Sequence, residues 1–217
     1  MEDCRTRYPL LLIHGLNCRD DWIFSYWGPL TELLRGRGAA VYLSGQDAWG
    51  SVPGNARALL RRGSDILAET GSEKLNLIAH SKGGLEARYL ISTLGFAEKT
   101  ASLTTICTPH RGSKAAAEWL GREKACRLFG PALEGFWRAR GDREPDFRAA
   151  VSALTPEAME RFNAENPDSP LVHYQSWGAR LDRPVRDPMD RVQLWLTKAY
   201  GPTDGLVSPD SAVWGHW

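Results

Sequence analysis

Short apolar runs alternate with helical periods along the first half of the chain. A continuous apolar run at 8–13 predicts a buried strand, and shorter strands are expected at 39–43, 74–79 and 102–107, the last rich in β-branched residues. Between them, apolar side chains recur every three or four residues, as in amphipathic helices packed on a sheet, over 27–35, 55–69 and 83–94. This alternation of strand and helix predicts a parallel α/β sheet covered by helices.

A long connection separates the fourth predicted strand from a fifth at 172–177. Such folds usually join strand and helix with roughly 2 to 6 residues, so we expect an insertion, placed at about 114–168. Phe129, Phe136 and Trp137 recur at helical spacing within it, and Thr155 followed by proline is a typical helix start. Helical padding on the sheet and a mobile lid over an active site, with a groove for an acyl chain, are both consistent with this pattern.

Length and composition fit one globular domain over 1–217. The 27 Lys and Arg against 26 Asp and Glu give a net charge of +1, which supplies no electrostatic case for nucleic acid or an anionic membrane. No apolar run approaches the roughly 20 residues of a membrane span, and the start does not have the pattern of a secretory signal. As written, the sequence predicts a cytoplasmic protein, or a secreted one if an N-terminal signal is missing.

The clearest chemical signal is the segment from Ala79 to Gly83, which reads Ala-His-Ser-Lys-Gly at the junction of a predicted strand and helix. A nucleophilic serine at such a junction needs a tight turn, so the residues two before and two after it must be small. The helix that follows also directs its positive end at Ser81, which favours negative charge in a transition state. Ser81 is therefore the candidate nucleophile, and an ordinary surface serine is the alternative.

Two backbone N–H groups and a carboxylate would complete such a site. The N–H of Lys82 and that of Leu16, after Gly15 in the loop that follows the first predicted strand, are the candidate oxyanion donors. The acid should follow the serine on a loop after a later strand. Asp204, in a glycine-rich turn, meets this requirement, and a turn aspartate bonded to its own backbone is the alternative.

Four blocks of sequence resemble one family in the same order along the chain: PLLLIHGL, NLIAHSKGGLEARYL, TTICTPHRGS and GPTDGLVSPDSA. They are similar to the bacterial triacylglycerol lipases and related esterases of the α/β-hydrolase fold. The resemblance implies a mostly parallel sheet with helices on both faces and a helical, lid-like insertion. It also implies Ser81 as nucleophile, Leu16 and Lys82 as oxyanion donors, and Asp204 as the triad acid.

The chemistry requires no cofactor, but the resemblance allows a structural calcium ion. Asp187, in RDPMD, holds a comparable place, and a solvated surface carboxylate is the favoured alternative. The four cysteines have no C-x-x-C spacing, so free thiols are favoured over disulfides.

The triad histidine is the part of the pattern that this chain does not match. By chain order His216 is the sole histidine after Asp204. In the resembling lipases, however, the catalytic histidine follows a further strand. Either His216 serves as the base from a shortened terminus, or the C-terminus is truncated and the true histidine lies beyond residue 217. The second interpretation is favoured.

These residues predict a serine hydrolase of carboxylic esters that acts on acylglycerols or fatty acyl esters through an acyl-enzyme. The expected partner is a lipid or small ester, with contact to a lipid interface, no nucleic acid and no transmembrane segment. One alternative is a catalytically impaired hydrolase-fold protein that serves as a binding module. Another is an acyltransferase or thioesterase that uses the same residues.

Overall fold

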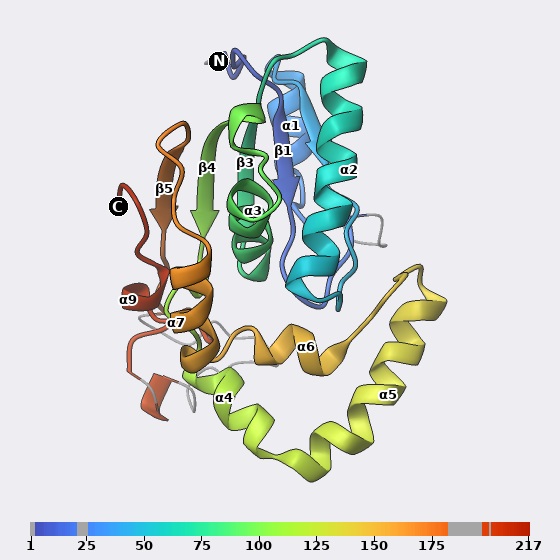
Figure 1. Ribbon diagram of the computed structural model, residues 1–217, viewed down its shortest axis with the longest axis vertical. Coiled ribbons are helices and arrows are strands. Elements are labelled where there is room, and N and C mark those ends of the chain that lie inside the picture. Colours follow the sequence, from blue (N-terminus) through green and yellow to red (C-terminus); the bar gives the residue numbers. More distant parts are fainter. Residues whose placement is uncertain (1–2, 21–25, 182–196, 200) are drawn as a thin grey trace.

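The computed structural model describes residues 3–20, 26–181, 197–199 and 201–217. Within these residues, parallel strands form one five-stranded sheet with the order β2-β1-β3-β4-β5 (Figure 1). The strands are β1 (Leu10–Ile13), β2 (Val41–Leu43), β3 (Leu75–His80), β4 (Thr100–Ile106) and β5 (His173–Trp177). The predicted parallel α/β class is thereby confirmed.

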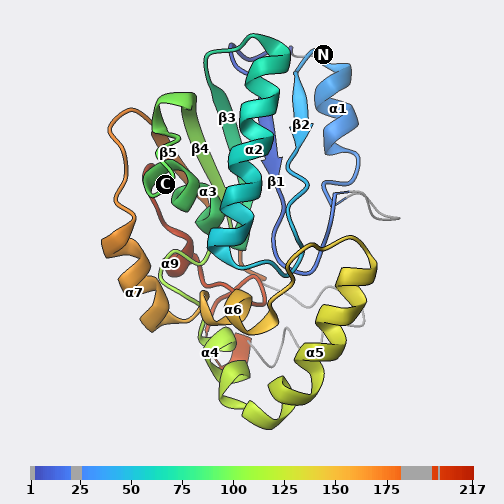
Figure 2. The ribbon, with the colours of Figure 1, turned by 45° about the vertical axis from the view of Figure 1, so that its right-hand side comes forward.

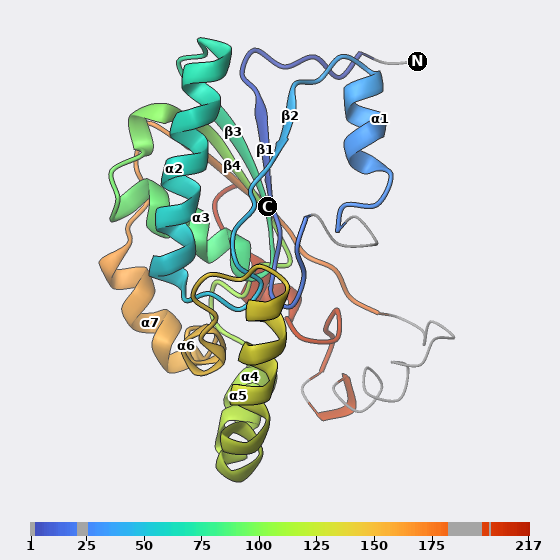
Figure 3. The ribbon, with the colours of Figure 1, turned by 90° about the vertical axis from the view of Figure 1, so that its right-hand side faces the viewer.

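Helices cover both faces of this sheet, with α1 on one side and α2 and α3 on the other (Figure 3). Right-handed crossover connections explain this arrangement. The connection from β1 to β2 moves toward one edge of the sheet, whereas those from β2 to β3 and from β3 to β4 move toward the other edge, so their helices lie on the opposite face. The helices are α1 (Leu30–Gly36), α2 (Val52–Thr70), α3 (Lys82–Ser92), the short 3-10 turn η1 (Ala97–Lys99), α4 (Lys114–Gly121), α5 (Glu123–Ala139), α6 (Phe147–Ser152), α7 (Pro156–Glu165) and α9 (Pro209–Ala212).

Strand β1 is buried along its whole length, as its unbroken apolar sequence requires. Leu11 and Ile13 belong to the main core, which they share with buried side chains of α2 and α3 such as Leu59. Leu10 and Leu12 point to the opposite face, into a smaller cluster with α1 and β2. The two-residue period of the strand thus divides the apolar side chains between the layers on either side.

The carboxyl ends of β1 and β3 lie side by side, yet the chain leaves these two strands toward opposite faces of the sheet. Open α/β sheets bind their ligands in the crevice that such a change of direction creates. The loop after β1 carries Leu16, and the turn after β3 carries Ser81. The fold itself therefore brings two of the predicted site segments together.

The insertion between β4 and β5 is helical, and α4, α5 and α6 extend beyond the carboxyl ends of the strands (Figure 2). The hydroxyl of Thr155 accepts the Ala158 N–H at 3.3 Å and so caps α7, as its sequence predicts. Trp137 is 2% exposed and packs in the insertion, whereas Phe129 on the same helix is 64% exposed. A lid function for these helices stays a prediction.

A stacked aromatic cluster fixes the end of the chain. The Trp214 ring lies 3.7 Å from the Arg88 guanidinium and stacks on His110 at 5.0 Å between ring centroids. Burial lowers the pKa of Arg88 to about 10 and that of His110 well below its usual range, where the nearby Arg88 acts in the same direction. The final segment is thereby held beside β5, at the outer edge of the sheet (Figure 1).

Among the described residues, none of the helices has both the length and the apolar character that crossing a bilayer requires.

Candidate active site

Ser81 occupies a strained turn between β3 and α3. Its backbone has φ 52° and ψ −130°, in a region that L-residues other than glycine rarely adopt. The surrounding chain holds the turn in place, because the Ser81 N–H donates to the Ile106 carbonyl at 2.9 Å and the Thr108 hydroxyl donates to the Ser81 carbonyl at 2.8 Å. Strain of this kind is retained mainly at functional sites, which supports the predicted strand-turn-helix elbow.

Two glycines let α3 start close to its neighbours. A Cβ at Gly83 would lie 2.9 Å from Ile13 Cγ2 and 3.0 Å from the Ile13 carbonyl oxygen, in β1. A Cβ at Gly84 would lie 2.7 Å from Thr108 Cγ2. The sequence predicts the need for a small residue at 83 but not at 84, because the second contact arises only when β4 packs beside β3.

The candidate oxyanion donors flank Ser81 on two loops. Lys82 is the first residue of α3, where an N–H has no acceptor within the helix. Within the described residues, neither this N–H nor that of Leu16 donates to another protein group. A Cβ on Gly15, next to Leu16, would lie 2.8 Å from the Ser81 Cβ, so the Leu16 loop runs directly against the serine. Among the described residues, both N–H groups are therefore left without a protein acceptor, as a pair of oxyanion donors requires.

Asp204 lies on a turn that its own carboxylate stabilises. Its Oδ1 accepts the N–H groups of Leu206 and Val207 at 2.9 and 2.8 Å. This is the turn geometry of the alternative interpretation, but the carboxylate also lies near enough to act electrostatically on Cys107, directly after β4, and on His80, directly before Ser81. The structure therefore brings the Asp204 side chain to the residues that adjoin the serine.

Cys107 is a site residue that the sequence analysis missed. All four cysteines are free thiols, as expected, but Cys107 is buried beside Asp204 and has a positive φ of 51°. Burial, followed by the Asp204 charge, raises the pKa of the Cys107 thiol to about 12, so the thiol stays neutral near pH 7. Its position at the carboxyl end of a predicted strand is the signal that could have revealed it.

Tyr26 and His80 form a second unpredicted part of the site. The Tyr26 hydroxyl accepts the Gly15 N–H at 3.0 Å and contacts His80 Nδ1. Burial raises the pKa of Tyr26 and lowers that of His80, although the Asp204 charge opposes the second shift. Both groups are consequently neutral near pH 7. They connect the Leu16 loop to the strand that carries Ser81.

The structure does not bring His216 to Ser81. The His216 N–H donates to the Tyr174 carbonyl at 2.9 Å, and its carbonyl accepts the Ser176 N–H at 2.8 Å, so the residue is bound along β5. Strands β4 and β5 lie between it and β3, which ends at His80, directly before Ser81, and the His216 side chain is exposed. Chain order selects His216, but order alone does not show which edge of the sheet a terminal residue joins.

Asp187, the candidate calcium ligand, lies outside the described residues. In the part of the chain that is described, no group of three or more His, Cys, Asp or Glu side chains could hold a metal ion. Calcium binding stays a prediction.

A cavity of about 550 Å³ opens beside the Asp204 turn. Ser113 at the start of α4, Pro156 at the start of α7, and Gly205 and Leu206 of the turn contribute to its lining. Its volume falls within the range of ordinary small-molecule sites, so the Asp204 turn is adjacent to space that a ligand can occupy.

Fold and site together define a protein of the α/β-hydrolase fold with a serine elbow. Among solved structures, a Bacillus licheniformis lipase in its mature form matches with a TM-score of 0.74 at 18% identity, over 97% of this chain and 84% of that one. No protein-family model matches the chain.

Sequence comparison identifies the family. A triacylglycerol lipase from Pseudarthrobacter phenanthrenivorans is 42% identical over 98% of this chain and 87% of its own length. Another, from Burkholderia plantarii, is also 42% identical, over 98% of this chain and 77% of its own. The chain belongs to the triacylglycerol lipase family, as the four sequence blocks predict.

Proposed function

We propose that this protein hydrolyses carboxylic esters of lipids, acylglycerols or fatty acyl esters, through an acyl-enzyme on Ser81. Ester hydrolysis follows from membership of a family whose relatives are triacylglycerol lipases. The observation that carries the role of Ser81 is its positive φ at a strand-to-helix turn, against a loop with a free N–H. That geometry serves acyl transfer and has no evident use in packing.

In the proposed reaction, Ser81 Oγ attacks the acyl carbonyl carbon while its proton passes to the imidazole of the triad histidine, the one member of the triad that is not assigned to a residue of this chain. The N–H groups of Leu16 and Lys82 hold the negative oxygen of the tetrahedral intermediate. The bond to the alcohol then breaks, and the alcohol takes the proton. Water attacks the acyl-enzyme in the same manner, releasing the acid and restoring Ser81. Asp204 orients and stabilises the imidazole that carries the proton.

Contact with lipid is supported by exposed apolar side chains on the insertion. Trp119 on α4 and Leu128 and Phe129 on α5 are each at least half exposed, at 50%, 72% and 64%. Large apolar side chains gathered on one helical arm favour an apolar surface as partner.

Esters of increasing acyl length test the substrate class. We expect kcat/KM for p-nitrophenyl butyrate or palmitate to exceed that for the acetate by at least about 10-fold, because each buried methylene adds to transition-state binding. Exclusive cleavage of the acetate would contradict a lipid substrate and leave a short-chain esterase.

His216→Ala tests whether His216 is the catalytic base, as chain order suggests, or only a residue bound along β5, as the structure shows. We expect the variant to hydrolyse p-nitrophenyl butyrate within about twofold of wild type, because alanine keeps both backbone bonds to β5 and the exposed ring touches nothing catalytic. The measurement is kcat at pH 7 alongside thermal unfolding. A loss of about 100-fold or more, with unchanged stability, would instead assign the base to His216.

A hydrolase-fold protein without turnover is the second candidate function. It is favoured by one observation, namely that the histidine selected by chain order is bound along the outer strand. Failure to cleave any ester of the series, together with saturable binding of the palmitate ester to folded protein, would support it.

A further inference from the structure

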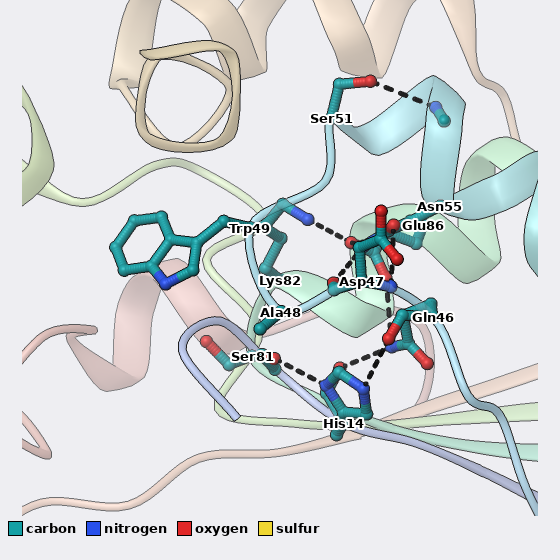
Figure 4. A network of polar contacts seen from close by, with 12 residues as sticks. His14, Gln46, Asp47, Ala48, Trp49, Ser51, Asn55, Ser81, Lys82 and Glu86 are labelled. Carbon is teal, nitrogen blue, oxygen red and sulfur yellow. Dashed lines mark hydrogen bonds and ion pairs between the residues drawn. The ribbon is translucent and has the colours of Figure 1, made fainter. Parts of the chain in front are cut away.

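A buried network of polar side chains joins Lys82, next to Ser81, to Gln46 and His14 (Figure 4). Lys82 and Glu86, one turn apart on α3, form an ion pair whose side chains are 1% and 2% exposed. The proposed reaction uses only the backbone N–H of Lys82. Burying two charged groups costs free energy of desolvation, which their mutual attraction and further hydrogen bonds must offset.

The Glu86 carboxylate is shared among three segments of the chain. Its Oε1 contacts Lys82 Nζ and also accepts Asn55 Nδ2 at 2.8 Å. Its Oε2 accepts Gln46 Nε2 at 3.2 Å. Asn55 lies in the first turns of α2, and Gln46 in the loop after β2. One carboxylate thus joins α3, the helix that follows Ser81, to the two segments that follow β2.

Gln46 extends this connection to the oxyanion loop. The side-chain Nε2 of Gln46 also donates to the backbone carbonyl of His14 at 2.9 Å. The backbone carbonyl oxygen of Gln46 lies 3.2 Å from His14 Nε2. The second ring nitrogen, Nδ1, lies 2.8 Å from the Gly15 carbonyl. In addition, the Asn17 N–H donates to the Ala48 carbonyl at 3.1 Å. The segment around Leu16 is therefore bound to the Gln46 loop on both sides of the donor.

The same loop binds the connection between α5 and α6. The Asp47 carboxylate accepts two backbone N–H groups of residues 143–144, at 2.9 and 2.7 Å. In return, the Asp142 carboxylate accepts two backbone N–H groups of residues 48–49, both at 3.0 Å. The Gln46 loop is consequently fixed from both directions and gives the oxyanion loop a rigid support.

We propose that Glu86 and Gln46 are positioning residues, which hold the Leu16 loop and the start of α3 at a fixed separation so that the two N–H groups converge on one oxygen. This inference rests on the proposed function. Catalysis through such donors depends on their placement, and an error of about 1 Å can cost about 100-fold in rate. A shared buried carboxylate supplies that precision because it accepts from several loops at once.

Kinetics of Gln46→Met and Glu86→Gln test the proposal, with Thr93→Val as the matched control. Thr93 follows the last residue of α3 and donates to Asn166 Oδ1 at 2.6 Å, so its removal breaks a partly buried polar link at the other end of α3, away from the elbow. For both test variants we expect kcat on p-nitrophenyl butyrate to fall about 10- to 100-fold with KM within about twofold. The control should keep kcat within about twofold.

Glu86→Gln leaves the Lys82 ammonium buried without a counter-charge, so it can lower stability by itself. The double variant with Lys82→Met removes both charges and is expected to fold, while kcat stays low. If Gln46→Met and the double variant both fold and both keep the kcat of wild type, the proposal is overturned. That result is expected if Gln46 and Glu86 only stabilise the fold.

Hydrogen exchange supplies a readout that does not need turnover. In Gln46→Met we expect the amides of 14–17 to exchange at least about 10-fold faster, while Thr93→Val leaves them unchanged. Unaltered exchange in Gln46→Met would overturn the positioning role even in a protein that hydrolyses nothing. Absence of hydrolysis by wild type contradicts only the proposed function, so the two failures are distinguishable.

Discussion

Ser81→Ala is expected to lower kcat/KM for ester hydrolysis by at least about 10⁴-fold, the largest effect of any single substitution. Without Oγ no acyl-enzyme forms, and what remains is the rate enhancement from the oxyanion donors and binding alone. Alanine adopts the strained backbone of residue 81 about as well as serine, so the free energy of unfolding should change little.

The matched control is Ser64→Ala, which removes an exposed hydroxyl on α2 that bonds only to its own helix. It should retain full activity. Initial rates on p-nitrophenyl butyrate, at protein concentrations checked by circular dichroism, measure both variants. Turnover within about 10-fold of wild type in folded Ser81→Ala would exclude Ser81 as the nucleophile.

Asp204→Asn is expected to lower kcat by about 10³- to 10⁴-fold with a small change in KM. The amide oxygen can still accept the N–H groups of Leu206 and Val207, so the turn should persist. What is lost is the negative charge, which holds the imidazole in the productive tautomer and stabilises the imidazolium. The effect should therefore fall on the chemical step.

Asp210→Asn is the control for the loss of a carboxylate in the same segment. Asp210 is exposed, and only its backbone carbonyl takes part in a hydrogen bond, from Arg111. We expect its kcat and thermal unfolding to equal those of wild type. If Asp204→Asn behaved in the same way, Asp204 would be a turn residue and the triad acid would lie elsewhere.

The sheet could be predicted because its signals are local. The apolar run of β1 reflects burial on both faces, and the helical period of α2 reflects burial on one. The start of α2 was placed three residues too late, at Asn55, because the proline and glycine before it resemble a loop. In the structure Ser51 caps the helix through Gly54 N–H at 3.1 Å, and a proline in the first turn needs no N–H.

The insertion was harder to resolve into elements. The period around Trp137 marked α5, but α4 and α6 were not predicted as separate helices. Both are short, and α6 is stabilised by packing of Phe147 against Trp49, a residue far away in the chain. Helices of this length depend on tertiary contacts more than on their own sequence.

Within the candidate site, local motifs suggest Ser81 and Asp204 as site residues, whereas they do not predict the long-range contacts. Glu86 meets Gln46 and Asn55 across 40 and 31 residues, and no spacing rule connects them. The four-residue interval between Lys82 and Glu86 was visible in the sequence. The burial of this pair could not be predicted, because a charged pair on a helix usually faces solvent.

Labelling with a fluorophosphonate tests most directly the central claim that Ser81 is the nucleophile of an ester hydrolase. Folded wild-type protein is treated with the probe, and the adduct is located by mass spectrometry of its peptides. We expect one adduct, on Ser81, that disappears when the protein is unfolded first and in Ser81→Ala. An adduct on another serine, or none on Ser81 in the folded protein, would contradict the claim.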